Sequence, residues 1–339
     1  MMMTEIQLRP IWRWELTALS IVLLLVSCIV AITIGPVQLN AFEIIRTILG
    51  QDSSLSEQER ALLMEIRLPR VALAALVGAA LATSGATYQT VFRNPLADPY
   101  LLGAAGGAGL GATIAITGSN QEFNASLPIF AFLGGILAVV ATFFVAGRLY
   151  NDPGSLLLSG IAVGSFAAAV QTFLQQRNSD ALRPVYSWIL GQLTVADWSS
   201  VRWAAVYIFI AIGILVSISK ILDALMLSDE EAFSLGISPN RIRIIAVCAA
   251  TLATATAVSV SGLIGFVGIV VPHIIKRLTR KATNRALLSI AFFGAAFLVL
   301  ADLGARTLIS PAEIPIGVIT AFIGAPFFLF ILRARGSTR

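Results

Sequence analysis

The chain has 339 residues, of which 57% are hydrophobic and only 12% are charged. A water-soluble protein carries about 25% charged residues, so the composition excludes an ordinary soluble protein. It predicts instead an all-α, polytopic membrane protein, with residues 1–339 forming a single transmembrane domain.

Ten apolar stretches follow one another along the chain. A helix needs about 20 apolar residues to cross the bilayer, so the sequence predicts about ten transmembrane helices. We expect them at residues 16–35, 70–91, 100–118, 127–147, 155–174, 202–219, 241–260, 262–276, 285–304 and 314–332. The span at 262–276 is short, and Ser261 with Gly262 separates it from the span before it.

The basic residues are distributed unevenly between the two ends of these spans. With the N-terminus placed in the cytoplasm, 15 of the 23 lysines and arginines fall on the cytoplasmic side. This bias agrees with the positive-inside rule and predicts that both termini are cytoplasmic. The net charge of +5 then reflects topology and does not indicate nucleic-acid binding.

Several smaller features complete the topology. No Ala-x-Ala-like cleavage site follows the first apolar segment, which we therefore expect to be retained. Cys28 and Cys248 fall within spans, so we expect both to be buried and to form no disulfide. Residues 41–49 form an amphipathic stretch that predicts a helix along the membrane interface. Ser310 and Glu313 have capping-box spacing and predict a short outer helix.

The sequence lacks the residues of several common chemistries. None of the three lysines follows a glycine, so there is no phosphate-binding loop and the chain cannot by itself be a P-loop ATPase. The Gly-rich run 103–111 lacks dinucleotide-binding spacing and predicts close helix packing instead. The single histidine, His273, is expected to pack at the inner end of a span, and no metal-ligand cluster lies within the spans. We therefore expect no enzymatic activity and no cofactor in this chain.

Asp302 is the one clear acidic residue within a span. Arg306 lies four residues later on the same helix face, so we expect an ion pair at the outer end. A proton relay built on one carboxylate is the alternative. Since ion-driven carriers depend on several intramembrane ionisable groups, a secondary transporter or channel is disfavoured but stays an alternative.

The run from Arg93 to Pro99 interrupts two apolar stretches. Asn94 and Asp98 are suitable helix N-caps, each followed by a proline, and the run therefore predicts two successive helix starts. Spacing alone leaves open whether it is a surface loop or lines a pathway.

A second polar segment lies between the sixth and seventh spans, at about residues 220–240. Ser228 and Glu231 have capping-box spacing, the first turn is acidic and Gly236 predicts the helix end. This segment is either a solvated connector or a docking element for a cytoplasmic partner.

Three arginines violate the charge bias at the outer side: Arg67, Arg70 and Arg306. Guanidinium groups there could anchor lipid headgroups. They could also bind carboxylates of an extracytoplasmic protein.

In combination these motifs resemble the FecCD family, the permease subunits of ABC importers for iron-siderophores, haem and cobalamin. The residues that carry the resemblance are Arg67 to Arg70, Gly85, Gln89, Arg93 to Pro99, Leu102, Gly103, Gly107, Ala108, Trp188, Gly191, Asp229 to Gly236, Gly265 to Gly268, Val271 to His273, Ala301, Asp302, Ala305, Arg306, Glu313 to Gly317 and Gly324 to Pro326. They extend over roughly residues 60–330.

The resemblance implies a ten-helix type II importer permease in a bacterial cytoplasmic membrane. Its partners would be a second permease subunit, two ATPase subunits that bind ATP and Mg²⁺, and an extracytoplasmic binding protein. By the same resemblance Arg67, Arg70 and Arg306 would face acids on the binding protein. The ATPase coupling helix would comprise Ser228, Asp229, Glu230, Glu231, Ala232, Leu235 and Gly236. The gate and pathway set is Gln89, Asn94, Pro95, Leu96, Asp98 and Pro99.

This chain departs from the family pattern at its inner loops. Lys276 replaces a common arginine, and Thr279 to Lys281 replaces a Gly-rich turn. These departures concern the inner gate. The sequence does not distinguish siderophore, haem and cobalamin, or homodimer from heterodimer.

Overall fold

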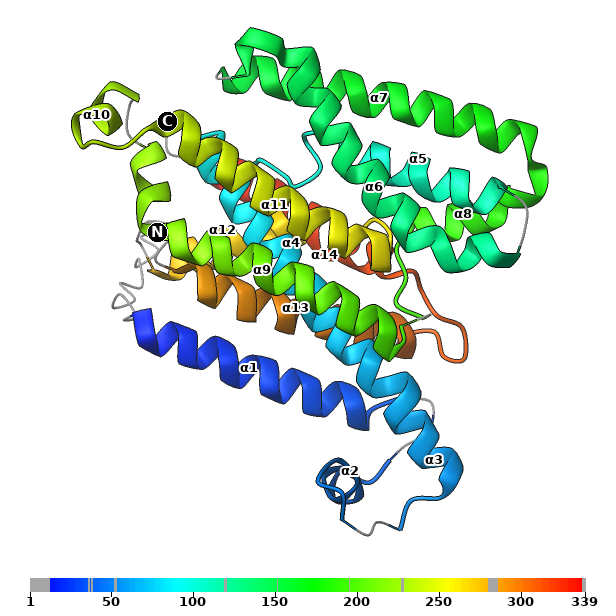
Figure 1. Cartoon of the computed structure of the whole chain (residues 1–339). Helices are drawn as coiled ribbons and strands as arrows, with labels where there is room; N and C mark the ends of the chain where they lie inside the picture. Colours follow the sequence, from blue (N-terminus) through cyan, green and yellow to red (C-terminus); the bar gives the residue numbers. More distant parts are fainter. Residues whose placement is uncertain are drawn as a thin grey trace.

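A computed structural model describes residues 13–35, 37, 39–51, 54–118, 121–150, 152–194, 196–226, 229–279 and 286–336. Within these ranges every regular element is a helix. The long helices run roughly side by side in one bundle (Figure 1).

Ten helices correspond in order to the ten predicted spans. They are α1 (Arg13–Thr33), α4 (Leu68–Val91), α5 (Ala104–Thr117), α6 (Gln121–Ala146), α7 (Pro153–Arg177), α9 (Trp198–Leu222), α11 (Pro239–Ser261), α12 (Val267–Thr279), α13 (Leu287–Thr307) and α14 (Ile316–Gly336). Among the described residues, seven helices are long and apolar enough to span a bilayer. The predicted all-helical fold is therefore confirmed.

Shorter elements connect these helices. They are α2 (Ala41–Ile48), α3 (Glu57–Ala61), the π-helical turn η1 (Leu62–Arg67), α8 (Leu182–Ile189), α10 (Asp229–Ser234) and the 3₁₀ turns η2 (Gly147–Leu149), η3 (Ser179–Ala181) and η4 (Asp223–Met226). The predicted amphipathic helix is present as α2. Its residues Phe42, Ile45 and Ile48 are exposed along one face.

The central helix is longer than the sequence predicted. Residues 57–91 form a continuous apolar helix of 35 residues, and 78% of its most apolar window is buried. It begins at a capping box in which Ser56 Oγ accepts from Glu59 N, and the Glu59 carboxylate accepts from Ser56 N. The predicted span at 70–91 does not include this start, although the Ser-x-x-Glu spacing signals it. The α4 part packs against α1, α9, α11, α12 and α13.

Small residues allow these helices to approach closely, as the sequence predicted for the Gly-rich run. Gly107 of α5 lies against the backbone of Gly134 in α6, and Gly106 lies against Gly164 in α7. The same device recurs on α4, where Gly85 faces the backbone of Gly268 in α12. Close approach of this kind replaces the hydrophobic driving force that lipid does not provide.

Two of the ten helices are too short to cross a bilayer. With a rise of 1.5 Å per residue, α5 and α12 are roughly 20 Å long against a hydrocarbon core of about 30 Å. Each follows a non-helical segment that enters the bundle, at residues 92–103 and 262–266. Ala97 and Leu102 in the first segment are completely buried. The run 93–99 is therefore not an ordinary surface loop.

Three local predictions are wrong. Asn94 and Asp98 start no helix, because α5 begins only at Ala104, after Gly103 in a left-handed conformation. Residues 308–315 form turns instead of a short outer helix. Cys248 is exposed at the surface of this chain and Cys28 is only partly buried, whereas both were predicted to be buried; both thiols are free, in agreement with the prediction.

Different elements lie at the two ends of the bundle. The first turn of α1, the last turns of α14 and the segment containing α10 lie at one end, at the left of Figure 1. The helices α2 and α3 lie at the other. We call these the inner end and the outer end. The arrangement agrees with an even number of crossings.

The contact between Gly85 and Gly268 gives a direct test of the packing. A Cβ at position 85 would collide with the Gly268 backbone, so Gly85→Ala should lower stability by about 1–3 kcal/mol through overpacking. The measurement is the thermal unfolding midpoint in detergent. Gly213→Ala in α9 is the matched control, since nothing lies within 4 Å of its Cβ position. Equal midpoints for the two variants would contradict the close approach.

Candidate functional site

The outer end holds a cluster of buried charges, which we call the outer cluster: Arg67, Arg70, Asp302, Arg306 and Glu313. The three arginines are only 3–8% exposed. They come from η1, α4 and α13, elements far apart in the sequence that the packing of α4 against α13 brings together.

Arg67 caps the end of α1. Its Nη1 donates to the carbonyl of Ile32 at 2.8 Å, and its Nη2 donates to the carbonyl of Val37. The last carbonyls of a helix have no partner within the helix and carry partial negative charge. Gly35 lies directly beside it, and a Cβ at this position would lie 2.7 Å from Arg67 Nη2. Arg306 donates in the same way to the carbonyl of Ala31.

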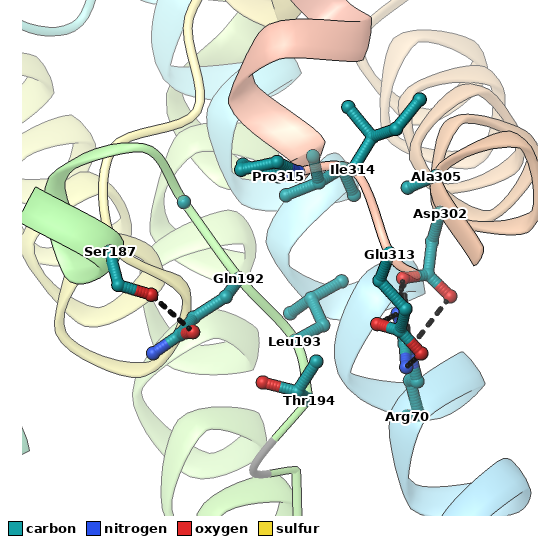
Figure 2. Close-up of a pocket in the computed structure, with 12 residues that line it drawn as sticks. Arg70, Ser187, Gln192, Leu193, Thr194, Asp302, Ala305, Glu313, Ile314 and Pro315 are labelled. Carbon is teal, nitrogen blue, oxygen red and sulfur yellow. Dashed lines mark hydrogen bonds and ion pairs between the residues drawn. The ribbon is translucent and has the colours of Figure 1, made fainter. Parts of the chain in front are cut away.

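Arg70 lies between two carboxylates (Figure 2). Its Nε donates to the Asp302 carboxylate at 2.9 and 3.1 Å. Its Nη1 and Nη2 donate to the two oxygens of Glu313 at 3.0 and 2.9 Å. The planar guanidinium is suited to such paired contacts. Asp302 is 2% exposed in its side chain and Glu313 is 37% exposed, so one partner is fixed in the bundle and the other borders solvent.

The predicted pair between Asp302 and Arg306 is confirmed at 3.6 Å. This contact is longer than the contact between Asp302 and Arg70, which is 2.9 Å. The sequence did not predict the contact with Arg70. It also missed Glu313 as a partner. Both contacts join residues more than 200 positions apart, so no local spacing could indicate them.

A small cavity of about 110 Å³ adjoins this cluster. Its wall includes Arg70, Glu313, Ser187, Gln192 and Thr194. Ser187 donates to the Gln192 side chain at 3.2 Å on the opposite wall (Figure 2). The docking role of Arg67, Arg70 and Arg306 stays a prediction, and the structure adds that each guanidinium already has acceptors within the chain.

The segment 92–103 holds most of the predicted gate residues. Asn94 Oδ1 accepts from Leu96 N at 2.9 Å, and Asp98 Oδ1 accepts from Tyr100 N at 2.8 Å. Both side chains thus close Asx turns. The sequence had predicted helix N-caps at these two positions instead.

This segment is held to the segment 262–266. The Tyr100 hydroxyl donates to the carbonyl of Ile264 at 3.0 Å and accepts from its amide at 3.1 Å. Pro99 packs on Gly268, where a Cβ would lie 2.7 Å from the proline ring. Arg93 and Phe266 are the two non-glycine residues with positive φ in the described ranges, at 48° and 68°. Each interrupted segment therefore contains one residue in a costly conformation.

Gln89 lies at the last turn of α4 and is 3% exposed. Its Nε2 donates to the carbonyl of Gly268 at 3.0 Å, and its Oε1 accepts from Lys276 Nζ at 2.8 Å. Gln89 therefore links α4 to α12. His273 on α12 meets Phe327 of α14 edge-on, with ring centroids 5.8 Å apart, which confirms its predicted packing role.

The inner-end helix α10 begins at Asp229, and Gly236 with φ of 76° follows its end as predicted. The predicted capping box includes Ser228, which lies outside the described residues. Ala232 is buried, whereas Phe233 and Leu235 are 60% and 64% exposed. An exposed apolar pair at the end of an acidic helix is typical of a contact surface.

An apolar groove of about 570 Å³ lies beside the segment 262–266. Its lining is Ile189, Leu190, Leu263, Gly317, Val318, Ala321, Phe322, Ala325 and Pro326. No charged residue lines it, and no group of three or more metal-ligating residues occurs among the described positions.

Together these features define a class: a multi-pass helical membrane protein with interrupted spans and polar elements at both ends. A family model for the FecCD transport family matches residues 23–334. The chain therefore belongs to the FecCD transport family.

Individual relatives agree with this assignment. The Fe(3+)-citrate import system permease protein YfmE of Bacillus subtilis is 35% identical over 97% of both chains. The cobalamin import system permease protein BtuC of Halobacterium salinarum is 40% identical over 82% of this chain and 75% of its own length. A solved structure of a metal-chelate type ABC transporter, in an inward-facing conformation, superposes with a TM-score of 0.84 at 28% identity and covers 94% of this chain and 99% of its own.

The outer cluster predicts a large and specific stability effect. Arg70→Gln leaves the buried Asp302 with only the longer contact to Arg306, and breaking a buried ion pair costs about 3–5 kcal/mol. The thermal midpoint in detergent should fall accordingly. Adding Asp302→Asn should recover part of the loss, because the unpaired buried charge is then removed.

Arg46→Gln is the control for this test. Arg46 pairs with Glu43 at 3.9 Å on the exposed helix α2, a type of pair that contributes about 0.3–0.5 kcal/mol. An Arg70→Gln midpoint equal to that of Arg46→Gln would refute the stabilising role of the cluster.

Proposed function

We propose that the chain is the permease subunit of an ABC importer that moves an iron complex, such as a siderophore or haem, or cobalamin into the cytoplasm. The observation that carries the proposal is the pair of interrupted segments, 92–103 and 262–266, which meet inside the bundle. Non-helical backbone at membrane depth is tolerated where it is buried in protein or lines a cavity. Interrupted helices of this kind mark the substrate path in many transporters.

The family relationship supports the rest of the assembly. The chain would act as one transmembrane domain in a bacterial cytoplasmic membrane, beside a second permease subunit. Two ATPase subunits would bind ATP and Mg²⁺, and a binding protein would deliver the substrate from outside. The inner end, with both termini and α10, would face the cytoplasm. The apolar lining of the groove suits passage of a large complex that is already chelated.

The alternative is a secondary transporter or channel. In the described spans Asp302 is a buried acidic residue, and its carboxylate is held by Arg70 and Arg306. A carboxylate neutralised by two guanidinium groups is a poor proton carrier. The ion-driven alternative therefore lacks a group to drive it.

Reconstitution separates the two functions. Liposomes containing this chain alone should not accumulate ferric siderophore, haem or cobalamin. Accumulation should appear only with the ATPase subunits, the binding protein and ATP. Uptake by the chain alone along an ion gradient would overturn the importer assignment. Mass spectrometry of the ligand that co-purifies with the binding protein would identify the substrate among the three classes.

The contact with the ATPase is tested on α10. The double variant Glu231→Ala, Leu235→Ala should reduce transport per ATP hydrolysed by roughly tenfold, because it removes a charge and an exposed apolar side chain from the proposed contact. Leu149→Ala is the control, since Leu149 is an exposed leucine of η2 outside α10. Unchanged coupling in the double variant would rule out this role of α10.

Docking of the binding protein is tested on the outer cluster. If an acid of the binding protein binds Arg70, it must compete with Glu313, which already occupies both Nη atoms. Glu313→Gln should then tighten docking, and the pair Arg67→Glu, Arg70→Glu should weaken it by roughly 5–30-fold, most strongly at low salt. Surface plasmon resonance on the nanodisc-embedded permease measures both. Arg148→Glu at the inner end is the control, and docking insensitive to all of these charges would eliminate the assignment.

A further inference from the structure

Arg93 is the second residue of the interrupted segment 92–103. It follows α4 with a left-handed backbone, φ 48°, which a residue with a Cβ rarely adopts. Its amide donates to Thr90, and the next amide donates to the carbonyl of Gln89 at 3.1 Å. These bonds end the helix and fix the direction in which the Arg93 side chain leaves it.

The guanidinium of Arg93 joins two elements of the segment 220–240. Its Nε donates to the carbonyl of Leu225 in η4 at 2.7 Å, and its Nη2 donates to Asp229 Oδ1 in α10 at 2.7 Å. One side chain therefore bridges the residues on both sides of positions 227 and 228. Arg243 of α11, which is 7% exposed in its side chain, approaches the same oxygen of Asp229 at 3.4 Å. Asp229 is thus shared between the end of α4 and the start of α11.

The same segment contacts the groove through its other end. Tyr100 holds both backbone groups of Ile264, and the neighbouring Leu263 lines the apolar groove. The backbone of the segment 92–103 therefore joins two contacts: the one between Arg93 and Asp229 of α10, and the one between Tyr100 and Ile264 beside the groove wall.

We propose that Arg93 is a positioning residue that fixes α10 to the interrupted segment 92–103, so that displacement of α10 moves the wall of the groove. The inference rests on the proposed function, because it assigns α10 as the element that an ATPase moves. The inference goes beyond the proposed function because it names the residue that connects α10 to the groove wall. The contact is half-exposed at Arg93 and Asp229, with 39% and 44% of their side chains accessible, so it can be broken without opening the bundle core.

The test uses the assembled importer in nanodiscs and liposomes, with transport and ATP hydrolysis measured in parallel. Arg93→Gln should leave ATP hydrolysis in place and lower the ratio of transported substrate to ATP hydrolysed by roughly two- to fivefold, the size expected for a half-exposed ion pair. Asp229→Asn should give the same loss. The loss in the double variant should be smaller than the sum of the two single losses, because the pair between Arg93 and Asp229 is common to both variants.

Arg241→Gln is the matched control. It removes the same charge from the exposed first turn of α11, and no salt bridge to α10 is found for it among the described residues. Its transport ratio should equal that of the wild type. If Arg93→Gln does not fold, Arg93→Lys is the second variant. It retains the charge but has one donor nitrogen in place of the two that bind Leu225 and Asp229, and it should also show a reduced ratio.

A wild-type ratio in Arg93→Gln or Arg93→Lys would overturn the inference, as would strictly additive losses in the double variant. Failure of the unmodified chain to assemble with an ATPase would be a different result. It would remove the proposed function itself, together with the role of Arg93 that rests on it.

Discussion

The structure depends on the rule that backbone groups inside a bilayer must be satisfied within the protein. The helices that are long enough to span the bilayer satisfy it largely with their own hydrogen bonds. The short helices α5 and α12 do not cover the full depth, and the segments before them must find other partners. They find them in each other, through the Tyr100 hydroxyl and the backbone of Ile264, and in Asx turns at Asn94 and Asp98. The two interruptions therefore depend on each other, because each segment supplies hydrogen-bond partners for the other.

Charge in the outer cluster follows the same logic. Two arginines cap the carbonyls at the end of α1, and the third is held between Asp302 and Glu313. Buried ionic groups are tolerated when each has partners of opposite sign or polar acceptors. The cluster fastens α1, α4, α13 and the turn before α14 at one point. Binding of a partner protein by the outer cluster is a separate proposal. Glu313 distinguishes this docking role from the stabilising role, because Glu313 is the member of the cluster that borders solvent.

The sequence predicts the ten spans well, because long apolar stretches between basic loops are a strong local signal. It also predicts the pair Asp302 and Arg306, since the two residues are one helical turn apart. It fails where a local signal has two physical solutions. An Asn or Asp before a proline can cap a helix or close an Asx turn, and buried contacts with Gly268 and Ile264 select the turn. The partners of Arg70 are invisible in the sequence for another reason: they depend on how α4 and α13 meet.

The unbroken helix at residues 57–91 has a mechanical consequence. At 1.5 Å per residue it is a rod of about 52 Å. The capping box at Ser56 lies at its outer tip and Gln89 lies near its inner tip, whereas Arg67 and Arg70 lie between the outer tip and the midpoint. A rod that tilts by about 10° around its midpoint displaces each tip by roughly 4–5 Å, in opposite directions. Such a tilt needs no series of side-chain contacts between the two faces of the membrane. A force that displaces the outer end of the helix also displaces its inner end, and with it the turn that contains Arg93.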